Sequence, residues 1–281
     1  MYTRPTAPRP IGGVLDDAVR LYRASFSRCW PLSLSAAVLA SIVAVWQTRQ
    51  LGSLPLTTLS NAGTSNASLA AMATLMARMS RMEHSPMLWL TYFLTMLVWL
   101  VFPAAIMRRQ DAVAQGRSDS LGEALGYVLR HLPTLIIAGI VFLLAIGVGF
   151  LLFVIPCIWL WGYLQLWLVA AATEGVGPFA ALGRSWKLIE HHWWRTSATV
   201  TVAWIIVLVI GLVSGLFTAI AAVLFRGDLP MVLATSQLLS ALLNIFTMPM
   251  WTVAMVAIFH DLSLRRDGGD LAARVNSLQP A

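Results

Sequence analysis

Two adjacent histidines, His191 and His192, are the side chains of this sequence with the most evident capacity for chemistry. They lie in the stretch ATEGVGPFAALGRSWKLIEHHWWRTS, residues 172–197, directly before Trp193 and Trp194. Helical zinc sites use histidines one turn apart, whereas neighbours on a helix point about 100° apart. We therefore predict no metal at this pair and place both histidines at headgroup level, within an aromatic belt.

Other chemical patterns are equally sparse. The sequence has no Gly-x-Ser-x-Gly motif, no phosphate-binding loop and no His-x-x-x-His pair, and its adjacent carboxylates Asp16 and Asp17 are interpreted as part of a helix face. Soft methionine ligands at Met72, Met76 and Met79 are an alternative copper site, but we interpret them as a packing stripe. We predict no catalytic residue, no cofactor and no metal, and hence no enzyme.

Amino-acid composition indicates the class of protein. The chain has 281 residues, of which 58% are hydrophobic and 11% charged, a balance typical of an integral membrane protein. A spanning helix needs about 20 apolar residues. Runs of this kind occupy residues 31–47, 87–107, 132–172, 196–225 and 231–259. At about 1.5 Å per residue the third run is long enough to cross twice, with Pro156 as the predicted turn, so six spans are expected.

The positive charges predict the orientation. If successive loops alternate between the two sides of the membrane, one side holds only four of the 19 Arg and Lys residues. These four are Arg49, Arg78, Arg81 and Arg226. Because short cytoplasmic loops carry most cations, both termini are predicted to be cytoplasmic, in a bacterial inner membrane. The same asymmetry, with anionic lipid as a partner, accounts for the net charge of +7 and leaves no support for nucleic-acid binding.

The spans are preceded by amphipathic segments. Asp16 and Arg20 have i,i+4 spacing on the first segment, and Ser120 and Glu123 form a capping-box pattern at the second. We predict an all-α polytopic membrane protein with six transmembrane helices in three hairpins, each preceded by a cytoplasmic amphipathic helix. One membrane domain covers residues 1–281, with possible tandem units 10–108, 109–172 and 173–266 and a cytoplasmic tail 267–281. An accidental likeness among amphipathic helices is the alternative to tandem units.

The third amphipathic segment is the predicted functional surface. A helix over residues 179–195 places Phe179, Leu182, Trp186, Ile189 and Trp193 on one stripe, with cations opposite, as in interfacial helices. The candidate lipid or partner surface consists of Arg184, Lys187, Arg195, Trp186, Trp193 and Trp194. Candidate structural charges are Glu174 and Glu190, and candidate helix-packing residues are Gly211, Gly215 and Ala219.

A family resemblance rests on the same segment. Residues 169–196 and the tail HDLSLRRDGGDL resemble the bacterial membrane domain fused to some glycerophosphoryl diester phosphodiesterases, and related stand-alone inner-membrane proteins. The matching residues are Glu174, Gly177, Pro178, Ala181, Arg184, Ser185, Trp186, Trp193 and Trp194. Such phosphodiesterases carry a His-Arg-Gly motif in a soluble barrel. Here no His precedes Arg and about 20 residues follow the last span, so that activity is not expected of this chain.

Two functions remain open. We favour a non-catalytic inner-membrane protein that binds lipid, or a partner protein, through the interfacial helices. The alternative is a transporter or permease-like protein for an amphiphilic or lipid-like solute. Transport would be favoured if the polar span residues Gln165, Gln237 and Asn244 lined a hydrated cavity, whereas packing roles for them favour the first function.

Overall fold

The computed structural model describes residues 4–5, 7–51, 86–225 and 229–278, and all regular elements in these parts are α-helices. The elements are α1 (Ile11–Leu51), α4 (Pro86–Ala114), α5 (Leu121–Arg130), α6 (Leu132–Leu152), α7 (Val154–Leu164), α8 (Trp167–Glu174), α9 (Pro178–Ile189), α10 (Trp193–Leu224) and α11 (Leu229–Leu278). No strand occurs in the described ranges. The predicted all-α class is therefore confirmed.

Six helical stretches are long and apolar enough to cross a membrane. They lie in α1, in α4, in α6, in α7 together with α8, in α10 and in α11. The expected set of six apolar helices is thus confirmed, since each stretch exceeds the length that a bilayer core requires. The methionine stripe at Met72, Met76 and Met79 lies outside the described residues.

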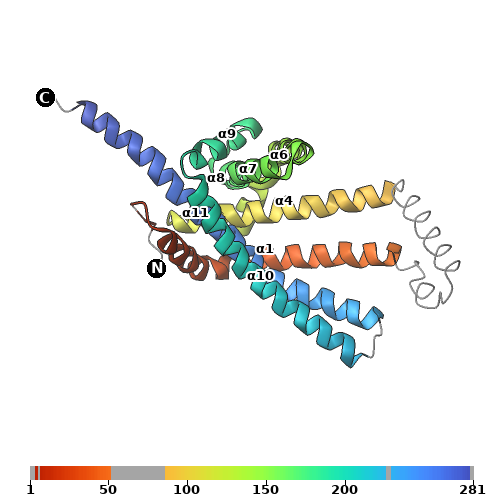
Figure 1. Cartoon of the computed structure of the whole chain (residues 1–281). Helices are drawn as coiled ribbons and strands as arrows, with labels where there is room; N and C mark the ends of the chain where they lie inside the picture. Colours follow the sequence, from red (N-terminus) through yellow and green to blue (C-terminus); the bar gives the residue numbers. More distant parts are fainter. Residues whose placement is uncertain (1–3, 6, 52–85, 226–228, 279–281) are drawn as a thin grey trace.

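The helices α1, α4 and α11 form the core. α11 packs along α1, α1 packs along α4, and α10 lies against α11. Leu21, Ile106 and Val256, one from each core helix, are completely buried. Both termini lie at the same end of this bundle, which we call the terminal end (Figure 1).

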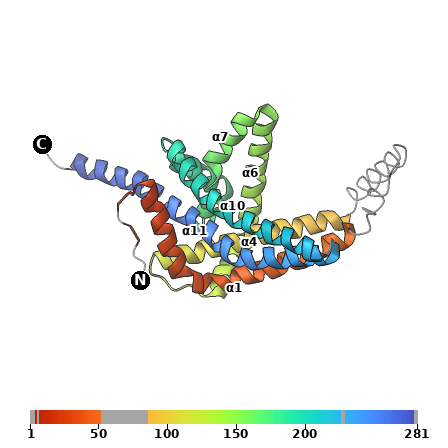
Figure 2. The ribbon, with the colours of Figure 1, turned by 60° about the horizontal axis from the view of Figure 1, so that its bottom comes forward.

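Helix α1 is longer than predicted. The expected amphipathic helix and first span form one continuous helix that includes Pro31. Figure 2 shows α1 changing direction along its length, as a proline inside a helix commonly causes. The predicted Asp16–Arg20 pair is confirmed at 2.7 Å, but Asp17 points inward and is buried. At α5, the predicted capping box of Ser120 and Glu123 is also confirmed.

The pair α6 and α7 projects sideways from the core. Both are seen nearly end-on in Figure 1, where α1 and α4 run lengthwise, and they stand away from the other helices in Figure 2. The chain reverses at Phe153, which is extended, and not at Pro156 as predicted. Pro156 lies in the first turn of α7, where backbone N–H groups have no intrahelical partner and proline therefore costs little.

The reversal also depends on Gly149. A Cβ atom at this position would lie 3.0 Å from the Cα atom of Cys157 on α7. The absence of a side chain therefore allows the backbones of α6 and α7 to come close. Both cysteines of the chain, Cys29 and Cys157, are free thiols.

Candidate functional site

Helix α9 packs on other helices of the protein through its apolar face. Ser185 is buried on this face; its Oγ donates to the Tyr163 carbonyl (2.8 Å) and accepts from the Leu166 N–H (3.1 Å). These partners lie at the break between α7 and α8, where backbone groups lose their helical partners. The Trp186 ring stacks on Tyr163 with centroids 4.3 Å apart. In the structure α6, α7 and α8 pack against α9, on the face that we expected to lie on the membrane.

The predicted helix over residues 179–195 is interrupted. α9 ends at Ile189, and His191 adopts φ +69°, which is uncommon for a residue with a Cβ atom. Trp193 begins α10 and Phe179 is 69% exposed, so neither belongs to one continuous stripe. The helical projection was wrong here because it assumed a constant direction through the turn.

Arg184 is held by two carboxylates. Its guanidinium lies 3.1 Å from Glu174 at the end of α8 and 3.0 Å from Asp267 on α11. Burial alone would lower the pKa of Arg184, but hydrogen bonds and charge from Asp267 and Glu174 outweigh it and raise the pKa. Arg184 therefore connects α8, α9 and α11 as a permanently charged bridge.

Arg195 is also engaged within the protein. Its Nη2 lies 3.2 Å from the Asp261 carboxylate on α11 and donates to the Arg9 carbonyl. Arg265 binds the same carboxylate at 2.9 Å and the same carbonyl. The backbone N–H of Arg9 donates to the other oxygen of Asp261. These contacts fasten the N-terminal segment to α10 and α11.

Lys187 differs from these arginines. Its side chain is exposed and forms no ion pair with a described residue, while its carbonyl accepts from Arg266. Arg266 also lies 3.9 Å from Glu190. Of the three cations predicted for the headgroup surface, Arg184 and Arg195 are therefore paired with internal carboxylates, and Lys187 has no ion-pair partner among the described residues.

A buried pair of side chains at the terminal end was not predicted from the sequence. His260 Nε2 on α11 lies 2.8 Å from Asp111 Oδ1 on α4, and both side chains are almost completely buried. Asp111 Oδ2 accepts from Gln115 (2.8 Å), and Arg117 lies 3.4 Å away. The predicted spans end at residues 107 and 259, so both partners fell just outside them. Their types and positions were visible in the sequence, but nothing there paired residues 149 positions apart.

A pocket of about 610 Å³ lies between α7 and the turn that joins α9 to α10. We call it the tryptophan pocket; its lining consists of Ile155, Ile158, Trp159, Tyr163, His191, His192, Trp193, Trp194 and Arg195. The Trp193 indole donates to the Trp159 carbonyl (3.4 Å) and fills the space beside Gly162. A Cβ atom at Gly162 would lie 2.4 Å from that indole nitrogen. The fold thus gathers both histidines and three of the predicted surface residues around one cavity.

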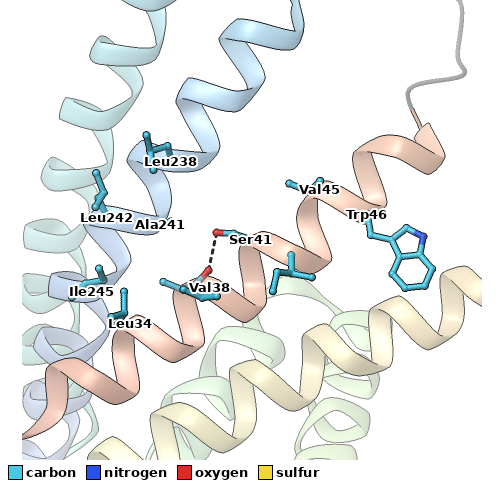
Figure 3. A pocket seen from close by; sticks show the side chains of 11 residues that line it. Leu34, Val38, Ser41, Val45, Trp46, Leu238, Ala241, Leu242 and Ile245 are labelled. Carbon is cyan, nitrogen blue, oxygen red and sulfur yellow. Dashed lines mark hydrogen bonds between the residues drawn. The ribbon is translucent and has the colours of Figure 1, made fainter.

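A second cavity is an apolar groove of about 920 Å³ between α1 and α11, which we call the α1–α11 groove. Figure 3 shows the two helices diverging from Leu34 and Ile245 toward Val45 and Leu238. The remaining lining residues are Ala37, Val38, Ser41, Ile42, Trp46, Ala241 and Leu242. The Ser41 hydroxyl donates to the Ala37 carbonyl (2.7 Å), so its hydrogen is already used within α1.

The predicted packing stripe on α10 is exposed. Gly211, Gly215 and Ala219 all face outward, and a Cβ atom built at either glycine would meet nothing within 4 Å. Within the described residues no other helix lies near either glycine, so the expected packing role stays a prediction. Small residues permit close contact but do not create it without an opposing helix.

The three polar span residues do not share a cavity. Gln237 and Asn244 line neither the groove nor the tryptophan pocket, although their neighbours Leu238 and Ile245 line the groove. The amide atoms of Gln165 are buried and have no hydrogen-bond partner among the described residues. The arrangement that would have favoured transport is therefore not present in the described cavities.

Comparison with protein families gives one match. Residues 30–262 match the model of a family described as Domain of unknown function (DUF7847). No curated protein and no solved structure matches the chain. The resemblance to the membrane domain of glycerophosphoryl diester phosphodiesterases is not among these matches and stays a prediction.

Proposed function

We propose that this chain, which belongs to the DUF7847 family, is a non-catalytic multi-pass membrane protein that binds membrane lipid. The observation that carries the proposal is the α1–α11 groove. Its volume of about 920 Å³ falls within the range of ligand cavities, roughly 300–1,000 Å³, and its lining is almost entirely apolar. A hydrocarbon chain of a lipid is the occupant that this lining suits.

The surroundings of the groove favour the same occupant. Its walls belong to the apolar stretches of α1 and α11, and in a bilayer core such stretches are surrounded by hydrocarbon. Polar groups in that environment require internal partners, and Ser41 has one in the Ala37 carbonyl. The groove therefore offers little to a polar solute and much apolar area to a flexible chain.

The orientation belongs to the same proposal. We place the protein in a bacterial inner membrane with both termini cytoplasmic and with α5 and α9 on that side. The cation asymmetry of the sequence supports this placement. The common location of the two termini at the terminal end agrees with it (Figure 1).

Transport of an amphiphilic solute is the alternative. It has less support because Leu238, Ala241 and Leu242 line the groove, where a hydrated path would need polar side chains such as Gln237 or Asn244. The non-catalytic part of the proposal rests on the lack of catalytic motifs in the sequence.

Filling the groove tests the proposal. Ala241→Trp places a large ring in the groove, and displacing even two methylene groups of a bound chain costs about 1.6 kcal/mol, roughly a tenfold loss of affinity. We expect native mass spectrometry of the purified protein to show about tenfold less bound phospholipid. The matched control is Ala219→Trp, at an exposed position of α10, which should leave bound lipid unchanged.

Equal lipid retention by both tryptophan variants and the unchanged protein would contradict lipid binding in the groove. Uptake of a labelled amphiphile into sealed proteoliposomes, abolished by Ala241→Trp, would favour the transporter alternative instead.

A further inference from the structure

We propose that the tryptophan pocket is a second lipid site, which binds the anionic headgroup of a phospholipid. This site lies on α7, α9 and α10 residues and shares no lining residue with the α1–α11 groove. The inference goes beyond the proposed function, because it assigns headgroup recognition to a separate place in the fold.

The wall of the pocket carries a positive charge. Arg195 lines the pocket, and its side-chain hydrogen bonds to described residues all use Nη2. The planar guanidinium presents further N–H donors at Nε and Nη1, in the geometry that phosphate oxygens accept. The internal network of Arg195 therefore does not exhaust its capacity to bind an anion.

The carboxylates behind Arg195 do not neutralise the region. The linked ionic groups are Arg9, Arg195 and Arg265 with Asp17 and Asp261. Three cations share two carboxylates, which leaves one excess positive charge directly behind the pocket. An anionic group in the pocket would complete this balance, and screening there is weaker than on an open surface.

The two histidines lie in the lining of the pocket. The φ of +69° at His191 breaks the path between α9 and α10 and brings both imidazoles to the pocket lining. Each imidazole provides ring nitrogens that can donate to an oxygen. The only hydrogen bond of the described residues to either ring is the long contact, 3.4 Å, between His192 Nδ1 and the Glu190 carbonyl.

The apolar rim of the pocket identifies the anion as part of an amphiphile. Trp194 is 82% exposed, Ile155 is 80% exposed and Ile158 is 54% exposed, so the rim of the pocket is apolar. Tryptophan rings are favoured at the level of lipid headgroups, where one part of the ring is apolar and its N–H is hydrated. A free inorganic anion would gain nothing from this rim, whereas a phospholipid would cover it.

The experiment uses the full chain in detergent micelles and follows its melting temperature during titration with short-chain phosphatidylglycerol. The test variant is His191→Gly combined with Trp194→Ala. Glycine retains the positive φ of the turn, and the exposed Trp194 ring contributes little to packing. We expect the half-saturation concentration to rise at least about tenfold, because a charge-directed hydrogen bond and an apolar contact are lost.

Two variants serve as controls. Trp204→Ala removes another exposed tryptophan of α10 and should bind phosphatidylglycerol like the unchanged protein. Ala241→Trp fills the groove, and the difference between the double variant and its parent should persist in this background, which separates the two lipid sites. A tenfold weakening by Trp204→Ala, or loss of that difference in the Ala241→Trp background, would overturn the inference of a distinct headgroup pocket.

Titrations with two other ligands identify the source of the anion. Short-chain phosphatidylcholine should half-saturate at a clearly higher concentration, and inorganic phosphate should produce no shift at the concentrations that saturate phosphatidylglycerol. Equal binding of the two lipids would overturn the role of charge, and equal binding of inorganic phosphate would overturn the role of the lipid. If the double variant were titrated like the unchanged protein, the tryptophan pocket would not be the binding site.

Discussion

α11 and α10 are adjacent long apolar helices with opposite degrees of burial. In the most apolar stretch of α11 56% of the residues are buried inside the structure, compared with 11% in α10. The difference does not follow from hydrophobicity, since the mean hydropathy of the α10 span is the higher one, 2.6 against 1.8. It arises from position, because α11 lies among α1, α4 and α10.

This contrast separates two uses of apolar side chains. On α11 they fill the protein core, so their loss leaves cavities. On α10, and on the sideways pair α6 and α7, large side chains such as Leu212, Leu151 and Ile155 are exposed to whatever surrounds the protein. In a bilayer that surrounding is hydrocarbon, which exposed leucine and isoleucine match without any protein partner.

The largest effect is expected where α11 is fixed to α4. Asp111→Ala leaves buried His260 without its acceptor, and removal of one partner of a buried pair typically destabilises by about 3–5 kcal/mol. Chemical unfolding in detergent micelles measures the loss. Asp16→Ala, which removes the carboxylate of an exposed pair, is the matched control and should cost less than about 1 kcal/mol. Similar losses for both variants would contradict the anchoring role of Asp111.

The next effect tests the contrast in burial directly. Ile106→Ala removes a completely buried side chain from α4 and should destabilise by about 2–5 kcal/mol, because a cavity remains. Ile206→Ala makes the same change at a position of α10 that is 44% exposed, and it should cost well under half as much. The same unfolding measurement applies. Equal costs would mean that α10 is covered by protein in the purified assembly.

The smallest effect concerns the surface predicted from the sequence, on helix α9. Arg184→Gln breaks the bridge between Glu174 and Asp267, and we expect a loss of about 1 kcal/mol, since the groups are partly exposed. High salt should reduce the difference from the unchanged protein. Lys187→Gln, which breaks no ion pair with a described residue, should leave stability unchanged. If Arg184→Gln left the free energy of unfolding unchanged but lowered the amount of co-purifying phospholipid, Arg184 would act as a headgroup-binding residue and not as a bridge.

Local interactions were predictable from the sequence. The lengths of the apolar runs indicated six helices that can span a membrane, because each residue adds a fixed rise. The capping box at Ser120 and the pair of Asp16 and Arg20 were predictable for the same reason, since both join residues within one helical turn.

Tertiary structure decided which cations form ion pairs within the protein and which remain available to a ligand. In the sequence, Arg184, Lys187 and Arg195 are equivalent cations on one amphipathic segment. In the structure, carboxylates more than 60 positions away pair with the two arginines: Asp267 with Arg184 and Asp261 with Arg195. Neither carboxylate pairs with the lysine. The reversal at Phe153 and the turn at His191 were likewise beyond a helical projection, because packing against other helices sets the direction of the chain there. A sequence pattern reports contacts within a turn or two of a helix. The pairing of His260 with Asp111, and the pocket around Trp193 and Trp194, exist only because separate helices pack together.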